Sequence, residues 1–551
     1  MSWHELKAEI AKHLDVPEQE IEEPDKEKMG DFAWPAFSKA KVEKKNPVEV
    51  AKALAAKLKV KGIKEIKPVG PYVNFFVDWA ALGNEILKEA GPGYGKGNEK
   101  RKAVIDLSSP NPAHPFHMGT VRSTVIGEAV ARTLEGRGWK VDRLCYVNDL
   151  GKQAATLLTG YLRYANGQKP EGKPDVWLGK LYMKINEESE QIEDEVFQNL
   201  HKYELGDRTM RELGRKVFGW CLEGFGQNWK LLGVKFDHMF WESDLVGESK
   251  LIIKELEKKK LTFESEGAMV LNLEPHGLPN TIIQRKDGSG LYLSRDIPQA
   301  IWRWKSMKPD LNLYVVAEGQ STHFNQLFKT LELLGHGELA KRSRHLAYGT
   351  VLLEGEKMSS RKGITVLWDQ LLEEGIKRAK EEIIGRWPDL SEKERNERAE
   401  QIAVGAIIYY ILKYSPEKTV NFTWSEAMRF EGDTGPYLQY THARARSILA
   451  KEKAKSFDAK HLTDEKEKAV LRMLAQWPSV LKKSATDLQP HQVAEYLHKL
   501  ADSFNEFYQT IRVIQAENDK LKGARLKLVE AVSEVLKTAM TLLAVPSPDK
   551  M

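Results

Sequence analysis

Two histidines and three prolines stand where a predicted strand gives way to a predicted helix. The chain reads VIDLSSPNPAHPFHMGT over residues 104–120. The amino end of a helix presents unpaired N–H groups and the positive end of the helix dipole, so it attracts phosphate. His117 adds a donor there, and Gly119 lets a nucleotide approach the backbone closely. The stretch favours a phosphate site, but a capped turn with incidental histidines is the alternative.

A second group of cations lies in the stretch GEKMSSRKG, residues 355–363. It puts Lys357, Arg361 and Lys362 on one short loop after a strand-like run. Pyrophosphate that leaves ATP builds negative charge on its oxygens, and nearby cations stabilise that transition state. A single cluster of this kind is compatible with a basic surface loop. Together with the His117 loop, it favours an enzyme that activates its substrate with ATP.

The elements that must position these loops follow an α/β pattern. A strand over 104–109, a helix over 118–138 and a strand over 139–148 form half of a doubly wound parallel sheet. Ligands of such sheets bind beyond the carboxyl ends of the strands, where the His117 loop would lie. Further strand-like runs are predicted at residues 291–296, 311–320 and 344–355. We therefore predict an α/β fold, with a Rossmann-like catalytic domain over residues 100–405.

Other units surround this domain. Residues 1–95 join a helical start to alternating strands around Gly70-Pro71, which predicts a small α+β domain. Residues from about 160 to about 260 are mostly charged and helical, and we expect them to form an insertion in the catalytic domain. Residues 406–551 show helical periodicity and predict an all-α bundle.

The composition excludes several classes of protein. Cys145 and Cys221 are the only cysteines, so neither a disulfide framework nor a CxxC zinc site is available, and a reducing cytoplasm is expected. No apolar run approaches the roughly 18 residues of a membrane span, and the amino end lacks the apolar core of a signal peptide. The excess positive charge falls in residues 436–551. A polyanionic partner and an ordinary solvated surface both fit this charge.

Five ordered motifs resemble those of the arginyl-tRNA synthetases, a family of class I aminoacyl-tRNA synthetases. PFHMGT stands where that class carries its HIGH signature, and KMSS where it carries KMSK. SSPN precedes the first of these in SSPNPAHPFHMGT, as it does in the family, and the other three motifs are similar to YVNDLGKQ (146–153), YLSRD (292–296) and GPYLQYTHAR (435–444). The resemblance covers essentially the whole chain. GDFAWPAF and GPYVNFFVD resemble the family's N-terminal domain, and the bundle resembles its anticodon-binding domain.

The resemblance implies that the chain joins L-arginine to its tRNA at the expense of ATP. Arginine would form an arginyl-adenylate with Mg²⁺ present, and then pass to the 2′-hydroxyl of the terminal adenosine. Activation itself would need bound tRNA. The resemblance further implies a cytoplasmic monomer without zinc and without a membrane partner. The alternatives are a non-catalytic tRNA-binding relative and another adenylating or nucleotidyl-transfer enzyme of the same fold.

The resemblance also assigns residues to the site. Since a guanidinium needs planar carboxylate partners, we expect the arginine pocket to contain Asp106, Asn111, Glu242, Tyr292, Asp296 and Gln320. The residues expected to bind ATP are His114, His117, Gly119, Thr120, Lys357 and Ser359. Those expected to stabilise the departing pyrophosphate are His117, Lys357, Arg361 and Lys362. Asn74 and Phe75 are expected to meet a flipped-out base at the tRNA elbow.

Three positions depart from the family's motifs. Thr120 replaces the last histidine of HIGH, as other class I synthetases tolerate, and Asp106 stands where the family usually has Glu. Ser360 replaces the last lysine of KMSK. Relatives that lack this lysine place one just before HIGH, where this chain has His114, which is only partly cationic near neutral pH. We therefore expect the compensating charge to come from Arg361 or Lys362.

Overall fold

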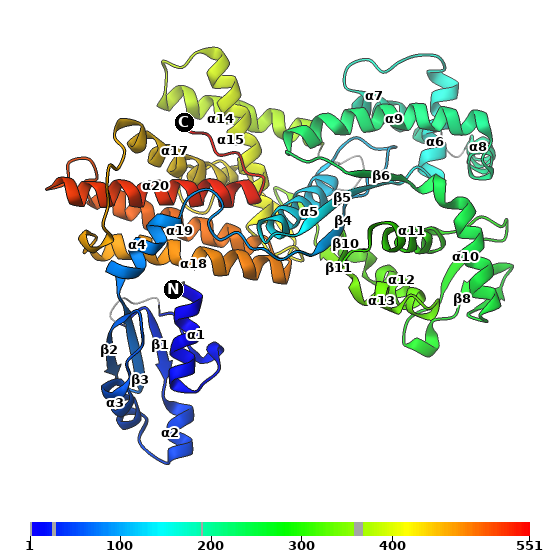
Figure 1. Ribbon diagram of the computed structural model, residues 1–551. Helices are drawn as coiled ribbons and strands as arrows, with labels where there is room; N and C mark the ends of the chain where they lie inside the picture. Colours follow the sequence, from blue (N-terminus) through cyan, green and yellow to red (C-terminus); the bar gives the residue numbers. More distant parts are fainter. Residues whose placement is uncertain (1–2, 25–28, 189–190, 358–366) are drawn as a thin grey trace.

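The computed structural model describes residues 3–24, 29–188, 191–357 and 367–551. Figure 1 shows a small N-terminal unit (blue), a helical bundle beside it (orange and red) and an α/β unit at the other end (cyan and green). Helix α4 (Trp79–Glu89) leads from the N-terminal unit onto the bundle. Among the described residues, no helix is long and apolar enough to cross a membrane.

A five-stranded parallel sheet forms the centre of the α/β unit. Its strand order is β11-β10-β4-β5-β6, and every neighbouring pair is parallel. The strands are β4 (Lys102–Ser108), β5 (Lys140–Val147), β6 (His238–Trp241), β10 (Leu311–Ala317) and β11 (Ser343–Tyr348). The chain moves outward from β4 in both directions, so a topological switch point lies between β4 and β10. The predicted doubly wound α/β fold is confirmed.

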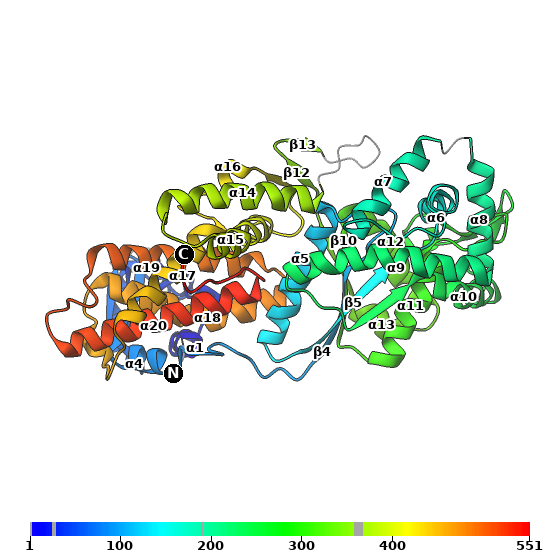
Figure 2. The same cartoon turned by 90° about the horizontal axis from the view of Figure 1, so that it is seen from above.

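Helix α5 (Met118–Gly136) lies between this sheet and the bundle, as Figure 2 shows. It is buried on both sides, which explains why most of its residues are small or apolar. Gly127 brings it unusually close to β4, because a Cβ built there would lie 2.3 Å from the Leu107 Cβ. This close packing places the first turn of α5 at the carboxyl end of β4.

One prediction about the sheet is wrong. Residues 291–296, predicted as a strand, begin helix α11 (Tyr292–Met307). The buried residues Leu293, Ile297 and Ala300 recur at helical spacing, which outweighs the short alternation at the start. The predicted insertion of residues 160–260 contains β6, which pairs with β5 and belongs to the central sheet.

The rest of the insertion is helical. Its helices are α6 (Lys152–Tyr164), α7 (Pro174–Glu187), α8 (Glu193–Leu205), α9 (Arg208–Leu231) and α10 (Val246–Lys258). A small antiparallel sheet follows, formed by β7 (Thr262–Ser265), β8 (Ala268–Leu271) and β9 (Thr281–Gln284). The sequence did not predict this sheet, because strands of four residues carry almost no periodic signal.

Residues 351–357 form a hairpin beside the central sheet. The predicted strand over 344–355 divides between β11 and a second sheet of order β13-β12-β14. That sheet consists of β12 (Val351–Leu353), β13 (Glu356–Lys357) and β14 (Val420–Phe422). The Gly355 N–H donates to Asn421 Oδ1 at 2.7 Å and so holds the turn against β14. Ser359, Ser360, Arg361 and Lys362 lie outside the described residues.

The bundle and the N-terminal unit complete the fold as predicted. The helices after the hairpin are α14 (Trp368–Arg386), α15 (Glu392–Leu412), α16 (Trp424–Ala427), α17 (Gly435–Lys451), α18 (Glu465–Asp487), α19 (His491–Thr510) and α20 (Asp519–Leu542).

The N-terminal unit has an antiparallel sheet of order β1-β3-β2. Its elements are α1 (Trp3–Leu14), β1 (Phe32–Pro35), α2 (Phe37–Glu43), α3 (Pro47–Lys57), β2 (Ile63–Val69) and β3 (Tyr72–Val77). Asp31 joins this unit to the bundle, because its Oδ1 lies 2.6 Å from Arg472 Nη2.

The contact between α5 and β4 leads to a stability prediction. We expect Gly127→Ala to destabilise the protein by about 1–3 kcal/mol, because the added methyl group overpacks the contact with Leu107. The measurement is the urea midpoint of unfolding followed by circular dichroism. Gly226→Ala in α9 is the matched control, since no atom lies within 4 Å of its built Cβ. A helical alanine should be neutral or stabilising there. Equal midpoints for both variants would contradict the close contact.

Candidate active site

His117 caps the amino end of α5. Its Nδ1 accepts hydrogen bonds from the N–H groups of Gly119, at 3.1 Å, and Thr120, at 3.4 Å. An acceptor nitrogen carries no proton, so the ring proton of the neutral imidazole lies on Nε2. Burial and the neighbouring His114 lower the pKa of His117 to about 4. Near neutral pH, His117 is therefore an uncharged donor, suited to a phosphate oxygen.

A cavity of about 350 Å³ opens beside this cap. Its walls come from the first turn of α5 and from the loops after β10 and β11, including Gly119, Gly319 and Gly349. The buried Arg122 secures one wall, since its guanidinium donates to the carbonyl oxygens of Thr350, at 2.8 Å, and Pro416, at 2.9 Å. The cavity lies at the carboxyl edge of the sheet, where nucleotides bind in folds of this kind.

The chain is described again from Leu367, which lies beside His117. Lys357 is the last residue of β13, and Leu367 forms an isolated β-bridge with His117. The Trp368 N–H also donates to the Phe116 carbonyl oxygen at 3.0 Å. Leu367 and Trp368 therefore lie against the His117 loop.

A buried carboxylate stands at the end of β6. Glu242 is 1% exposed, and its Oε1 lies 2.7 Å from Arg295 Nε, out of line for a hydrogen bond. Within the described part of the chain, neither Glu242 oxygen has a hydrogen-bond partner. Burial raises the pKa of Glu242 to about 8, despite the opposing charge of Arg295. Such a group is costly to bury unless a ligand completes its bonding, so Glu242 is poised for a cationic or donor-rich substrate.

Asp149 positions Glu242 from behind. Its Oδ2 accepts a hydrogen bond from Tyr203 Oη at 2.6 Å, and its Oδ1 accepts one from the Ser243 N–H at 2.9 Å. The sequence alone gave Asp149 no role, although this residue belongs to the YVND motif. Its position directly after a predicted strand was the signal that could have identified it. Asp149 therefore fixes the backbone that carries Glu242.

A second carboxylate faces the same edge from α11. Asp296 Oδ2 lies 2.6 Å from His323 Nε2. Burial would lower the pKa of His323, but the hydrogen bond and charge of Asp296 raise it. Tyr292 lies one helical turn before Asp296 and is 57% exposed, so its hydroxyl is accessible. Sequence analysis missed His323, which follows Gln320 by three residues in GQSTH.

The other predicted pocket residues lie at the ends of β4 and β10. Asp106 Oδ2 pairs with Arg303 Nη2 at 2.8 Å, and its Oδ1 accepts from the Ser109 hydroxyl at 3.1 Å. Asn111 donates through Nδ2 to Gln153 Oε1 at 2.6 Å. Gln320 is exposed just before helix α12 (Ser321–Leu333), and His114 packs edge-on against Tyr182. The sequence did not predict that Arg303 pairs with Asp106.

Asn74 and Phe75 lie away from this site, in the N-terminal unit. Both side chains are 0% exposed, and neither amide atom of Asn74 has a hydrogen-bond partner among the described residues. As placed here, neither side chain can reach a nucleotide. The neighbouring Phe76 is only half-buried, and Lys67 lies 5.2 Å from its ring centre.

Three family models match this chain. Residues 84–424 match the catalytic domain of class I (R) tRNA synthetases, and residues 438–551 match the DALR anticodon binding domain. Residues 4–77 match the arginyl tRNA synthetase N-terminal domain. A parallel sheet with the His117 cap at its switch point, joined to these domains, defines a class I aminoacyl-tRNA synthetase.

Individual relatives are similar over their whole length. The arginine–tRNA ligase of Clostridium perfringens is 37% identical and covers 100% of both chains. That of Lactococcus lactis is 36% identical and covers 96% of this chain and 95% of its own. The solved arginyl-tRNA synthetase of Thermus thermophilus has a TM-score of 0.86, with 30% identity over 100% of both chains. The chain belongs to the arginyl-tRNA synthetase family and charges tRNA with arginine, as predicted.

Proposed function

We propose that arginine is activated by ATP at the carboxyl edge of the central sheet. The observation that supports this is the placement of two carboxylates, Glu242 and Asp296, at the same edge as the His117 cap. The arginine carboxylate attacks the α-phosphorus, an O–P bond forms, and the bond to pyrophosphate breaks. The 2′-hydroxyl of the terminal tRNA adenosine then attacks the carbonyl carbon and displaces AMP. Positioning and charge stabilisation carry both steps.

ATP occupies the cavity beside α5 in this proposal. His117 donates through Nε2 to a phosphate oxygen, and Gly119 leaves room for the nucleotide beside the helix end. His114 and Thr120 also contact the nucleotide in this proposal. Mg²⁺ keeps most of its waters and binds through substrate phosphates in sites of this kind.

The guanidinium of arginine lies between Glu242 and Asp296 in this proposal. A guanidinium offers five donors in one plane, and it would satisfy the unpaired oxygens of Glu242. Tyr292 closes the pocket from the start of α11. The α-amino group lies toward Asn111 and Gln320, with Asp106 Oδ1 behind. Arg303 neutralises part of the charge of Asp106, so Asp106 acts mainly by accepting a hydrogen bond.

We infer that tRNA contacts both terminal domains, which lie near residues 1–95 and 406–551. The catalytic domain between them lies near residues 100–405. A cavity of about 610 Å³ at the ends of α17 and α19 is lined by Arg444, Tyr508 and Arg512. The Arg444 guanidinium lies 5.1 Å from the Tyr508 ring, and Tyr508 is 39% exposed. Aromatic rings flanked by cations suit single-stranded RNA bases. In the N-terminal unit, Phe76 fits a base contact better than the buried Asn74 and Phe75. The monomeric state and the cytoplasmic location stay predictions.

The central experiment is Asp296→Asn. We expect the arginine KM of tRNA charging to rise steeply, because a buried guanidinium loses its charged partner. The loss of binding free energy should be about 3–5 kcal/mol. The ATP KM should stay nearly unchanged. Asp244→Asn is the matched control, since this nearby aspartate is 59% exposed and pairs with Arg215 at the surface. Wild-type arginine KM in Asp296→Asn would place the guanidinium elsewhere.

The raised pKa of Glu242 predicts a pH dependence of arginine binding. The free carboxyl, with a pKa of about 8, is mostly protonated near pH 6, whereas a bound guanidinium requires the carboxylate. Binding therefore releases a proton, and the Kd for arginine should fall by up to about tenfold per pH unit between about pH 6 and about pH 8. Calorimetry in two buffers of different ionisation enthalpy measures this release.

The matched variant for this test is Glu242→Gln. It should bind arginine weakly, and the part of the proton release that belongs to Glu242 should disappear. Asp149, Asp296 and Arg295 also face this carboxyl, and His323 titrates beside Asp296. A Kd that is constant over this range in the wild type would show that Glu242 is already ionised or lies outside the pocket.

The loop cations predict a defect confined to the chemical step. We expect Lys357→Ala and Arg361→Ala to slow adenylate formation by roughly 10²–10³, the scale of losing one preorganised donor. Arginine KM should barely move, because the loss falls on the transition state. Lys362→Ala should be milder, and His114→Lys should partly rescue the others. Single-turnover rates with tRNA bound decide the matter. Wild-type rates in all three alanine variants would show that GEKMSSRKG is a basic surface loop with no part in adenylate formation.

A further inference from the structure

Helix α7 of the insertion lies against the loop that precedes His117. The ring centres of Tyr182 and His114 are 4.9 Å apart, and the two rings meet edge to face. One turn earlier in α7, Gly179 makes room for Pro115, because a Cβ built on Gly179 would lie 2.3 Å from Pro115 Cγ. Any side chain at this position would push the loop away from the helix.

A third contact of α7 is a hydrogen bond to the loop backbone. Asp175 Oδ2 accepts from the Phe116 N–H at 3.2 Å. Because Asp175, Gly179 and Tyr182 are spaced by four and three residues, they share one face of the helix. They contact three consecutive residues of the loop, in reverse order along the chain. One face of α7 therefore holds the whole approach to His117.

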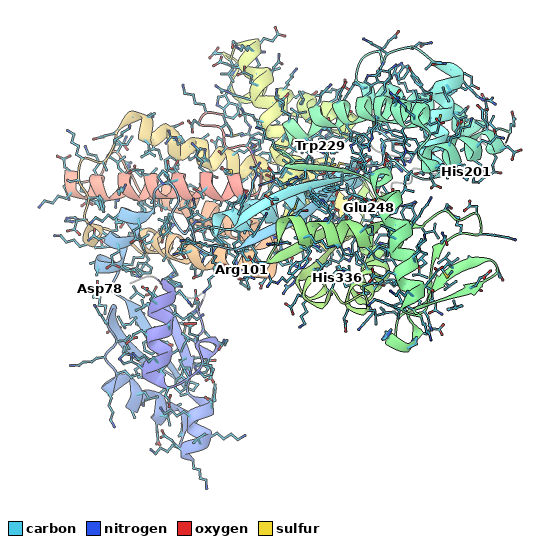
Figure 3. All side chains as sticks on the ribbon, turned by 45° about the vertical axis from the view of Figure 1, so that its right-hand side comes forward. Asp78, Arg101, His201, Trp229, Glu248 and His336 are labelled. Carbon is cyan, nitrogen blue, oxygen red and sulfur yellow. The ribbon has the colours of Figure 1, made fainter. Side chains whose placement is uncertain are left out.

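The Phe116 side chain is held as closely as its backbone. It is 0% exposed, and its ring centre lies 5.4 Å from that of Phe225 and 6.5 Å from that of Trp229, both in α9. Figure 3 labels Trp229 near the carboxyl end of α9. With both its backbone and its ring held, Phe116 fixes the direction in which His117 leaves the loop.

Asp175 is closely packed and incompletely bonded. It is 0% exposed, and a Cβ built on Gly224 of α9 would lie 2.2 Å from its Oδ1. Within the described part of the chain, this Oδ1 has no hydrogen-bond partner, and the Lys173 Nζ lies 3.8 Å away. The carboxylate therefore has no room to turn away from Phe116.

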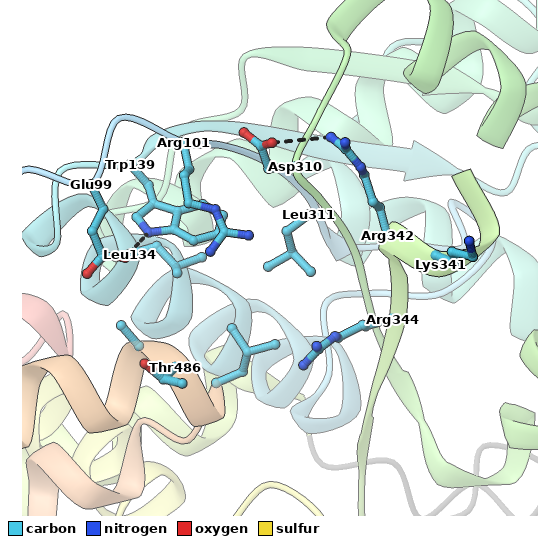
Figure 4. A pocket seen from close by; sticks show the side chains of 12 residues that line it. Glu99, Arg101, Leu134, Trp139, Asp310, Leu311, Lys341, Arg342, Arg344 and Thr486 are labelled. Atoms are coloured by element: carbon cyan, nitrogen blue, oxygen red, sulfur yellow. Dashed lines mark hydrogen bonds and ion pairs between the residues drawn. The ribbon is translucent and has the colours of Figure 1, made fainter. Parts of the chain in front are cut away.

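An acid at the opposite edge of the central sheet is bonded differently. Asp310 Oδ1 pairs with Arg342 at 3.2 Å, as Figure 4 shows, and its Oδ2 accepts from the Lys102 N–H at 2.9 Å. Both oxygens of that acid are engaged, whereas Asp175 engages one. Burying a carboxylate in this way costs free energy. Asp175 thus fits a residue retained for the position of its partner rather than for stability.

Lys173 joins Asp175 to the start of α14. Its Nζ lies 2.6 Å from each carboxylate oxygen of Asp369, the second residue of α14. Trp368, directly before Asp369, donates its N–H to the Phe116 carbonyl oxygen at 3.0 Å. Both backbone polar groups of Phe116 are therefore bonded to helices that Lys173 connects to each other.

We propose that Asp175 is a positioning residue for His117. Asp175 holds the Phe116 backbone, with Gly179 and Tyr182 beside it, so that His117 Nε2 is directed at a phosphate oxygen of ATP. This proposal rests on the role proposed above for His117. Asp175 touches no substrate, and it acts on adenylate formation through the placement of the His117 ring.

The test is the single-turnover rate of adenylate formation with tRNA bound, expressed per folded enzyme. We expect Asp175→Ala to slow this step by about ten- to a hundredfold, the scale of a small misplacement of a reacting group. The arginine KM should barely move, because Glu242 and Asp296 lie on other elements. A merely structural role would lower the thermal midpoint and leave the rate per folded enzyme unchanged.

Two further variants calibrate this result. Asp175→Asn should recover most of the rate, because its side-chain oxygen still accepts from the Phe116 N–H. Asp194→Ala is the matched control, since this aspartate also lies in the first turn of an insertion helix but is exposed. It should keep the wild-type rate.

Gly179→Ala tests the same face of α7 without touching a polar group. Alanine is the better helix former, but its methyl group displaces Pro115, so we expect adenylate formation to slow by at least about threefold. Gly226→Ala in α9 should keep the wild-type rate, since no atom lies within 4 Å of its built Cβ. Gly179→Ala decides the matter if Asp175→Ala does not fold, and a wild-type rate then overturns the proposal.

His117→Asn separates this proposal from the one on which it rests. Asparagine still caps α5 but lacks the ring donor, so adenylate formation should be slow. If His117→Asn is slow while Asp175→Ala keeps the wild-type rate, the positioning role alone is overturned. A wild-type rate in His117→Asn would overturn both proposals. An Asp175→Asn variant as slow as Asp175→Ala would assign the effect to charge and would also overturn the positioning role.

Discussion

The seating of α5 on β4 is the contact on which the rest of the structure depends. Gly127 lets the helix approach Leu107 more closely than any side chain would allow, and this fixes where the first turn of α5 emerges. His117 then caps that turn with its own Nδ1, so the ring proton must lie on Nε2. The opposite face of α5 packs on the bundle. One helix therefore positions the His117 cap and joins the α/β unit to the bundle.

Electrostatics at the two edges of the sheet follow opposite rules. At the carboxyl edge, acids are buried and incompletely satisfied, and Glu242 shows this most clearly, since neither of its oxygens has a hydrogen bond within the described part of the chain. At the amino edge, by contrast, the carboxylates are paired, because Glu99 lies 2.9 Å from Arg137 and Asp310 lies 3.2 Å from Arg342.

Sequence analysis found residues whose identity alone carries chemical information, and it missed those that act through position. His117, Glu242 and Asp296 belong to recognisable motifs, and the structure brings them to one edge of the sheet. Asp149 and His323 escaped notice, because their roles arise only when Ser243 and Asp296 come within hydrogen-bond distance. Residues 291–296 were predicted as a strand because six residues cannot show a helical period, and only the packing of α11 decided the question.

The sequence by itself determined the α/β class, the order of the N-terminal unit, the α/β unit and the helical bundle along the chain, and the family. These depend on local periodicity and on motif residues that lie close together in the chain. Tertiary structure alone decided that Leu367 returns to His117, that Arg303 partners Asp106, and that the side chains of Asn74 and Phe75 are buried. Each of these depends on which distant segments meet. Burial and pairing set the charge and the accessibility of a side chain, and neither quantity exists until the chain has folded.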